Sequence, residues 1–329
     1  MPSARIIGMG SYLPKKVLSN HDLEKMVETS DEWIVTRTGI KERRIAEKEE
    51  FTSDMGVKAA LIALDKAQLP IDKIDLILVA TLTPDYMFPS TAALIQSMLG
   101  ATQAAAFDFQ AACTGYLYGL SMAKGFIESG LYKNILLIAS EKLSSIINYK
   151  DRNTCVLFGD GASACVISDA GPGFFIREVC LGADGAVADL LMMPGGGCRE
   201  PATAETVANG RHTIMMGGKE VFKHAVRRME NAAKECLDKA KMEESEINWF
   251  VPHQANERII DAIAKRFSIA EERVYKTVHK YGNTSASAVA IALDELTAEK
   301  KIETGENILL VAFGAGFTWG ATVLTRVEG

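Results

Sequence analysis

The chain has 329 residues, 48% of them hydrophobic, so it can bury a sizeable core and is too long for one ordinary single-core domain. A net charge of -6 argues against general nucleic-acid binding, which needs an excess of Lys and Arg over the surface. The longest apolar run, "IDLILVATL", is far shorter than the ~18 residues of a membrane span, and the N-terminus does not read as a signal peptide. We therefore expect a cytoplasmic protein without membrane association.

The cysteines indicate a reducing compartment and no metal. None of the six lies in a CxxC or Cys/His metal spacing, so we expect reduced thiols and no metal site.

Short aliphatic and β-branched runs alternate with helical patterns along the chain, which is typical of an α/β fold with a largely buried sheet. Strands are predicted at 74–80, 134–140, 155–159, 247–253, 273–278 and 307–313. Gly/Pro-rich breaks fall at 168–175 and at 194–210, and the second is predicted to be a long surface loop.

Two pairs of these strands repeat. "NILLIAS" at 134–140 is nearly "NILLVAF" at 307–313, and the preceding strands "KIDLILVA" and "EINWFVPH" share a pattern at the same separation. This agreement predicts an internal duplication, with halves at 1–170 and 171–329. Superposing the halves aligns residue 80 with His253 and Cys113 with residue 286, at strand ends where open α/β sheets place ligands.

The segment "FQAACTGYLYGL" places Cys113 just before a helical apolar pattern that Gly130 is well placed to end. The positive end of a helix favours thiolate over thiol, and the neighbouring Ala and Gly residues would let a substrate approach. A lone cysteine in such a context is nevertheless most often buried packing, which we expect for the other five cysteines.

Three further segments narrow the interpretation. "WFVPHQAN" presents His253 at a strand end before a helix starting near Asn256, and "KYGNTSAS" places Asn283 in a tight loop before another helix. "AFGAGFTWG" is a glycine-interrupted strand end whose backbone N–H groups suit an oxyanion.

Together these segments resemble β-ketoacyl-[acyl-carrier-protein] synthase III, a thiolase-fold condensing enzyme that initiates fatty acid synthesis. The resemblance runs along the whole chain, through "GMGSYLP", "TSDEWIVTRTGI", "FPSTAALIQSMLG", "AACTG", "DRNTCVLFGDGA", "VPHQAN", "GNTSAS" and "GFTWG". It implies a thiolase-like α/β fold, two duplicated halves in a layered α-β-α-β-α architecture.

The resemblance implies a catalytic role for Cys113, His253 and Asn283. Cys113 would take the acyl group of an acyl-CoA. Malonyl on the carrier protein would then lose carbon dioxide, and a neutral His253 with Asn283 would donate hydrogen bonds to the enolate. The backbone N–H groups of Cys113 and Ala315 would form the oxyanion hole. Alanine at 315 departs from the family's glycine, but a backbone donor tolerates it if φ is negative.

The resemblance also implies binding residues and partners. CoA would contact Trp33 and Arg152, which would sandwich the adenine, and Thr29, Arg37 and Asn256. The acyl pocket would be lined by Leu143, Phe158, Leu191 and Ile214, and by Phe88 reaching across a homodimer interface. The acidic acyl carrier protein would bind Lys223, Arg258, Lys265 and Arg266. No cofactor is expected, since acyl-CoA and malonyl carrier protein are substrates.

Several alternatives remain open. Arg37 and Thr29 could instead be ordinary surface residues. Leu143, Phe158, Leu191 and Ile214 could equally be ordinary core, and any one of the basic residues could equally belong to a solvated helix face. A condensing enzyme of a specialised, polyketide-like pathway shares these motifs. A Cys-His-Asn hydrolase, a type III polyketide synthase and a non-catalytic acyl-CoA or carrier-protein binding protein fit the sequence less well.

Overall fold

A computed structural model describes residues 2–328 as a mixed α/β molecule built on one nine-stranded sheet. The strand order is β11-β12-β13-β8-β1-β7-β6-β4-β5. These strands are β1 (Arg5–Tyr12), β4 (Leu76–Ala80), β5 (Ala105–Phe109), β6 (Asn134–Glu141), β7 (Gly161–Ser168), β8 (Gly173–Ala183), β11 (Trp249–Pro252), β12 (Asn307–Gly314) and β13 (Thr318–Val327).

The sheet has two parts that meet at a short junction between β1 and β8. That pairing is limited to Arg5 with Phe175 and Ile6 with Phe174. On one side, β4 is parallel to β5 and β6; on the other, β11 is parallel to β12. The strands nearest the junction run antiparallel to their neighbours.

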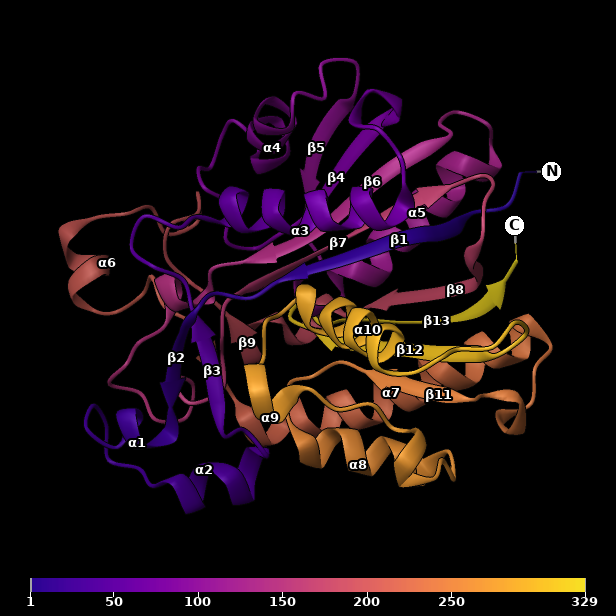
Figure 1. Cartoon of the computed structure of the whole chain (residues 1–329). Coiled ribbons are helices and arrows are strands. Elements are labelled where there is room, and N and C mark those ends of the chain that lie inside the picture. Colours follow the sequence, from indigo (N-terminus) through magenta and orange to yellow (C-terminus); the bar gives the residue numbers. More distant parts are fainter. Residues whose placement is uncertain (1, 329) are drawn as a thin grey trace.

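Helices form three layers around these two parts (Figure 1). Two helices, α5 (Gly115–Glu128) and α10 (Ser287–Glu299), lie between the parts and contact both. The outer faces are covered by α3 (Thr52–Ala67) and α4 (Thr91–Leu99) on one side and by α7 (Gly218–Ala240) with α8 (Glu257–Arg266) on the other. The predicted α-β-α-β-α layering is therefore confirmed.

The α5 helix shows why the layers hold together. Tyr116, Leu117, Leu120, Ala123 and Ile127 recur on one face and are buried in the central core. Burying each large apolar side chain contributes roughly 1.5–3 kcal/mol. The helix ends before Gly130, whose φ of 75° suits a glycine, as its sequence pattern predicted.

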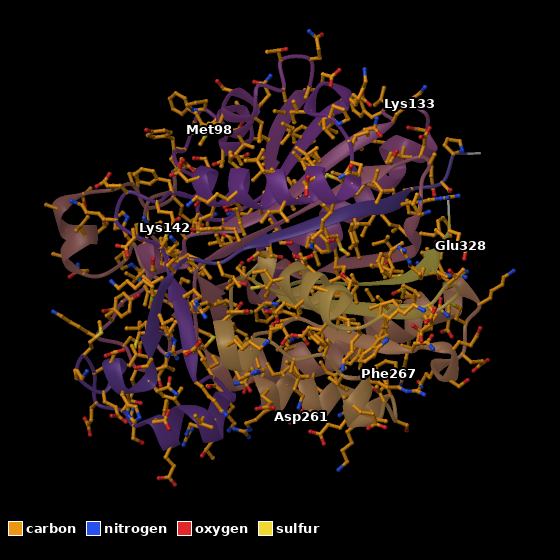
Figure 2. The ribbon with its side chains drawn as sticks, in the orientation of Figure 1. Met98, Lys133, Lys142, Asp261, Phe267 and Glu328 are labelled. Atoms are coloured by element: carbon orange, nitrogen blue, oxygen red, sulfur yellow. The ribbon has the colours of Figure 1, made fainter. Side chains whose placement is uncertain are left out.

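Smaller elements sit at one end of the molecule. A ribbon of β2 (Lys16–Ser19) and β3 (Glu42–Ile45) carries α1 (Asn20–Leu23) and α2 (Asp31–Thr38), while α9 (Val278–Tyr281) packs on β3. The predicted surface loop 194–210 contains a short helix, α6 (Ala204–Ala208), and its base is closed by β9 (Leu191–Met192) pairing with β10 (Met215–Met216). Figure 2 shows the side chains that fill the space between these layers.

Two strand predictions were wrong. Residues 155–159 form a turn with one bridge from Phe158 to Asn283; their apolar character reflects burial against the cluster around Leu143. Residues 273–278 keep one bridge, Val274 to Phe250. There the Gln254 side chain accepts the N–H groups of Thr277 and Val278, so the chain turns away from the sheet.

The predicted boundary between the two halves falls between two strands. The β7 strand ends at Ser168 and β8 starts at Gly173, inside the predicted break. We propose, on the repeated strands and the two central helices, that 1–170 and 171–329 are the related halves. Among residues 2–328, no helix is both long enough and apolar enough to cross a membrane.

Candidate active site

Cys113 lies on a tight turn between β5 and α5. The turn is a single 3-10 segment, Ala112–Thr114, that runs directly into the first residue of α5. Two hydrogen bonds to the Ala111 carbonyl hold this turn: the Thr114 hydroxyl donates at 2.6 Å, and the Thr318 hydroxyl of β13 donates at 3.0 Å. The chain therefore turns at the helix N-terminus, as predicted.

The thiol is not a resting thiolate, which corrects one expectation. Cys113 is buried, and burial raises the pKa of its thiol to about 11, although the side chains of Ser285 and Asn283 act to lower it. Loss of solvation of the thiolate thus outweighs its place at a helix start. Of the other cysteines, Cys198 is exposed, so the packing prediction was wrong for it.

His253 follows the last residue of β11 and faces the same site. Its backbone N–H donates to the Val311 carbonyl at 2.8 Å, which continues the pairing of β11 with β12. The ring is buried, and burial lowers the pKa of His253 to about 4. The imidazole is therefore neutral near pH 7, as its predicted role requires.

Asn283 is held by backbone bonds to the 157–159 turn. Its N–H donates to the Leu157 carbonyl at 2.8 Å, and its carbonyl accepts the Gly159 N–H at 3.0 Å. The Asn283 Oδ1 accepts the Ser285 N–H at 2.8 Å. Because the side-chain oxygen accepts this bond, it is the amide nitrogen of Asn283 that can donate toward Cys113 and the cavity.

The two turns share an unusual backbone conformation. Ala112, just before Cys113, has φ 46°, and Ser285, just before Ala286, has φ 53°. The predicted superposition aligns these positions. Left-handed backbone at a residue with a side chain costs on the order of 1–3 kcal/mol and is characteristic of functional sites. Ala315 is not among the described non-glycine residues with positive φ. It therefore meets the condition under which an alanine here can offer its backbone N–H to the oxyanion.

Gly314, the last residue of β12, packs directly against the nucleophile turn. A Cβ at this position would lie 2.7 Å from the Cys113 backbone N and 3.2 Å from its Cβ. The turn therefore requires glycine here because any side chain would displace Cys113.

Replacing Gly314 by alanine should destabilise the fold by about 1–3 kcal/mol through overpacking. We expect a lower melting temperature and slower labelling of Cys113 by a thiol reagent. Gly125→Ala is the matched control, since a Cβ on this α5 residue meets nothing within 4 Å. Equal behaviour of the two variants would contradict the close packing assigned to Gly314.

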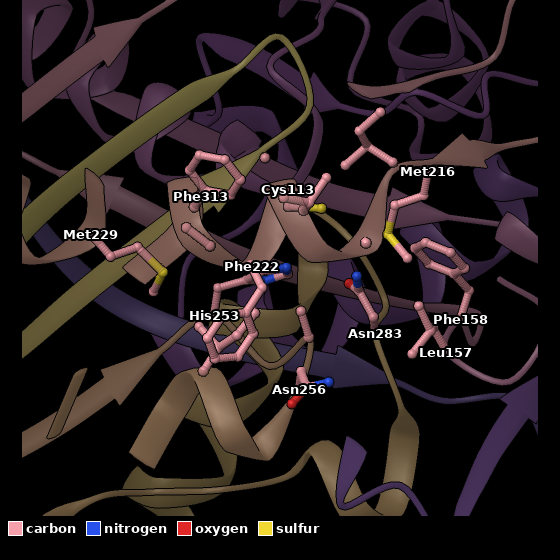
Figure 3. Close-up of a pocket in the computed structure, with 17 residues that line it drawn as sticks. Cys113, Leu157, Phe158, Met216, Phe222, Met229, His253, Asn256, Asn283 and Phe313 are labelled. Carbon is pink, nitrogen blue, oxygen red and sulfur yellow. The ribbon is translucent and has the colours of Figure 1, made fainter. Parts of the chain in front are cut away.

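Cys113, His253 and Asn283 line one cavity of about 120 Å³ (Figure 3). In this view His253 and Asn283 lie on opposite sides of the cavity below Cys113, and Asn256 lies at its lower edge. The structure thus brings together the three side chains that the sequence singled out from three distant strand ends.

A second cavity, of about 440 Å³, leads away from the other side of Cys113. The predicted acyl-pocket residues Leu143, Phe158, Leu191 and Ile214 all line it, as does Ala315. Phe88 does not; its side chain is 86% exposed on the loop before α4. Within a single chain, therefore, Phe88 is not part of the pocket.

A third cavity opens the site to the surface beside α2. Trp33, Arg37 and Asn256 line it, and Asn256 also borders the first cavity. Asn256 caps α8 and donates to the Arg37 carbonyl at 3.0 Å, so it ties α8 to α2. Arg37 and Arg152 both stack on the Trp33 ring, at 4.8 and 5.2 Å from its centre. Thr29 lies just before α2, and its buried hydroxyl has no hydrogen-bond partner among the described residues.

The four predicted carrier-protein residues separate into two groups. Lys223 and Arg258 line the surface cavity, together with Lys219. Lys265 and Arg266 lie exposed at the far end of α8, where Arg266 pairs with Glu230 at 2.7 Å.

Sequence analysis gave no role to three residues that the structure places at the site. Gly314 and Ser285 stand within segments already singled out, "AFGAG" and "GNTSAS". Glu141 ends β6 and is fully buried, and its charge acts on the Cys113 thiol. No sequence signal marks Glu141, because it is the polar last residue of an ordinary apolar strand.

Family models match both parts of this site. The model for 3-oxoacyl-[acyl-carrier-protein] synthase III matches residues 107–185, which include Cys113. The model for the C-terminal part of the same enzyme matches residues 237–326, which include His253 and Asn283.

Relatives extend the similarity to the whole chain. The β-ketoacyl-[acyl-carrier-protein] synthase III of Chlamydia caviae is 64% identical over 327 residues, covering 99% of this chain and 98% of that protein. The crystal structure of the Aquifex aeolicus 3-oxoacyl-[acyl-carrier-protein] synthase III is 47% identical, with a TM-score of 0.90 and coverage of 98% and 100%. The priming β-ketosynthase of the R1128 polyketide pathway is 36% identical, with a TM-score of 0.90 and coverage of 99% and 97%.

The sequence motifs, the geometry of the site and the relatives all indicate the same family, and the similarity extends along the full length of the chain. The chain belongs to the β-ketoacyl-[acyl-carrier-protein] synthase III family, and its fold is the thiolase-like fold of that family.

Proposed function

We propose that the chain condenses an acyl-CoA primer, such as acetyl-CoA, with malonyl-[acyl-carrier-protein] to give 3-oxoacyl-[acyl-carrier-protein], CoA and carbon dioxide. This acyltransfer initiates fatty acid biosynthesis. The observation that carries the proposal is one cavity lined by Cys113, His253 and Asn283, with an apolar cavity behind the thiol and an entrance lined by Trp33.

In this reaction Cys113 attacks the acyl-CoA thioester and becomes acylated while CoA leaves. Malonyl carrier protein then enters and loses carbon dioxide. The amide of Asn283 and a neutral His253 donate to the resulting enolate, and each such donor is worth on the order of 3 kcal/mol. The enolate carbon attacks the acyl-Cys113 carbonyl, whose oxyanion accepts the N–H groups of Cys113 and Ala315.

We assign the entrance to the CoA moiety. An indole face and a planar guanidinium both stack on a purine, and Trp33 and Arg152 already lie against each other. Arg152 donates to the Glu28 carbonyl at 3.2 Å, which keeps it beside this entrance, and because it is exposed its side chain can move aside to admit the base. Thr29, Arg37 and Asn256 would contact the rest of the CoA.

The acyl chain would extend from Cys113 into the cavity lined by Leu143, Phe158, Leu191 and Ile214. The carrier protein would dock at the entrance, where Lys223 and Arg258 supply positive charge on an acidic enzyme. Lys265 and Arg266 would extend that contact along α8.

An unpaired edge of the sheet is evidence for a homodimer. Within residues 2–328, β5 is paired on one side only, and Tyr86, Met87, Phe88 and Phe107 are exposed nearby. Exposed strand edges and apolar patches of this kind mark interfaces. A partner on this edge would bring Phe88 toward the neighbouring acyl pocket. We further propose a cytoplasmic enzyme that needs no metal or other cofactor.

One related function has a specific observation in its favour. The similarity to a polyketide priming ketosynthase keeps a specialised pathway as the second candidate. The chemistry at Cys113 would be the same, and the carrier protein would differ.

The test is incubation of the protein with a panel of acyl-CoAs, followed by intact-protein mass spectrometry and peptide mapping. We expect an acyl group on Cys113, then carbon dioxide and 3-oxoacyl product when malonyl carrier protein is added. Absence of any adduct and of carbon dioxide release would contradict the proposal. The best acyl-CoA would identify the primer, and turnover with only a polyketide carrier protein would favour the second candidate.

A further inference from the structure

Glu141 is a buried carboxylate beside the nucleophile. Three groups donate to it: Thr83 Oγ1 at 2.6 Å, the Leu82 N–H at 3.2 Å to each oxygen, and Thr81 Oγ1 at 3.3 Å. The Ser285 side chain also acts to lower its pKa. No basic side chain pairs with it among residues 2–328. Even with these donors, burial raises the pKa of Glu141 to about 7. A carboxyl group in this position can take up or release a proton near neutral pH.

Nearby charged groups do not engage this carboxyl group. Lys142 points away and donates to the carbonyls of Glu47, Lys48 and Glu50. Asp160 accepts from Ser144 and the Ala46 N–H, and Asp85 accepts from Ser53. On the cavity side, the titratable group on which the Glu141 charge acts is the Cys113 thiol.

Ser285 connects Glu141 with Cys113. It is 1% exposed, and its hydroxyl has no partner of close hydrogen-bond geometry in the described part of the chain. Ser285 and Cys113 line the same cavity, and the Ser285 side chain acts to lower the pKa of both the Cys113 thiol and the Glu141 carboxyl group. A buried hydroxyl without a hydrogen-bond partner is rare in proteins and calls for a structural or functional explanation. Ser285 has a left-handed backbone, and the cavity that it shares with Cys113 is also lined by Leu82, whose N–H donates to Glu141.

Cys113 needs such an acceptor. Its thiol is protonated at neutral pH, and only the thiolate attacks a thioester efficiently. The polar side chains that act on the thiol are those of Ser285, Glu141 and Asn283. Asn283 can only donate or accept hydrogen bonds, so Glu141 is the group among these three that can hold the proton.

We propose that Ser285 and Glu141 form a proton relay for Cys113, an inference that rests on the proposed function. As Cys113 Sγ bonds to the acyl carbon and the carbon–sulfur bond to CoA breaks, the thiol proton passes to Ser285 Oγ, whose own proton passes to the Glu141 carboxylate. The CoA thiolate leaves and takes a proton from water. Glu141 stays protonated through the acyl-enzyme. When condensation expels the Cys113 thiolate, the proton returns by the same route.

The experiment measures single-turnover acylation of Cys113 by acetyl-CoA, by rapid quench and intact mass, between pH 5.5 and 9. The wild-type rate should rise with pH through about 7 and then level off, because the relay requires ionised Glu141. In E141Q and S285A we expect acylation to slow by about 10²-fold or more. E141Q should also lose the rise near pH 7, whereas E141D should keep it at a reduced rate.

The controls separate the relay from a structural role and from the proposed function. S287A removes a buried serine of the same segment that donates to backbone carbonyls, and E128Q removes a carboxylate far from the thiol; both should acylate like wild type. Decarboxylation of malonyl carrier protein should change less than about threefold in E141Q. If folded E141Q or S285A acylates at the wild-type rate with the same pH profile, the relay is wrong and the proposed function stands. If the wild type takes no acyl group, the proposed function fails. The relay is then tested separately by the pH profile of Cys113 labelling with iodoacetamide, and a profile that is unchanged in E141Q would overturn it.

Discussion

Replacing Cys113 by alanine is expected to remove acyl transfer completely and to lower condensation by at least about three orders of magnitude, as loss of a covalent nucleophile does. The fold should persist, because the turn depends on Thr114, Thr318 and Gly314 and not on the thiol. The measurement is intact mass after incubation with acetyl-CoA, together with a condensation assay.

Cys198→Ser is the matched control for this variant, since Cys198 is exposed on the loop between β9 and β10. It should acylate normally. Decarboxylation of malonyl carrier protein should survive in Cys113→Ala because His253 and Asn283 are untouched. Condensation with an acetyl-CoA primer by Cys113→Ala would rule out Cys113 as the nucleophile.

Replacing Asn283 by alanine should slow decarboxylation by about 10²–10³-fold, the usual cost of losing one oxyanion donor. Acylation of Cys113 should fall by much less, because the enolate forms only in the second half-reaction. The two half-reactions are measured separately, as acyl-enzyme formation by mass spectrometry and as carbon dioxide release from malonyl carrier protein.

Asn283→Asp sharpens this test. An aspartate keeps an oxygen to accept the Ser285 N–H, but it loses the amide donor and adds a charge that repels the enolate. It should therefore decarboxylate no faster than the alanine variant. Asn209→Ala, on the exposed loop at the end of α6, is the control and should leave decarboxylation unchanged. Equal losses in both half-reactions for Asn283→Ala would contradict the role given to the amide.

The sequence predicted where the site would be because strand ends carry clear signals. The apolar runs ending near Pro252 and Phe313, and the small residues around Cys113, mark places where buried strands give way to loops. The repeated strands then indicated which loops face each other. Both signals, the residue types at strand ends and the repeated strand pattern, can be read from a single sequence.

The remaining features depend on distant contacts. The pKa of Cys113 is set by burial among segments far apart in the chain, so the helix start alone gave the wrong direction. Residues 155–159 have the composition of a strand, yet they form a turn with a bridge from Phe158 to Asn283. Glu141 looks like the polar end of a strand until Thr81, Thr83 and Ser285 are placed around it.

The cavities on the two sides of Cys113 differ in what they connect. The apolar cavity behind the thiol meets the first cavity at Cys113, Phe158 and Leu191, whereas the surface cavity joins it through residues such as Asn256 and Phe222. CoA and the carrier-protein arm would therefore share one corridor to the thiol, while the acyl group is held on the opposite side. Two arms that share a corridor cannot occupy it together. In kinetic terms, the order of the two substrates would follow from mutual exclusion at the entrance, without any conformational signal between separate binding sites.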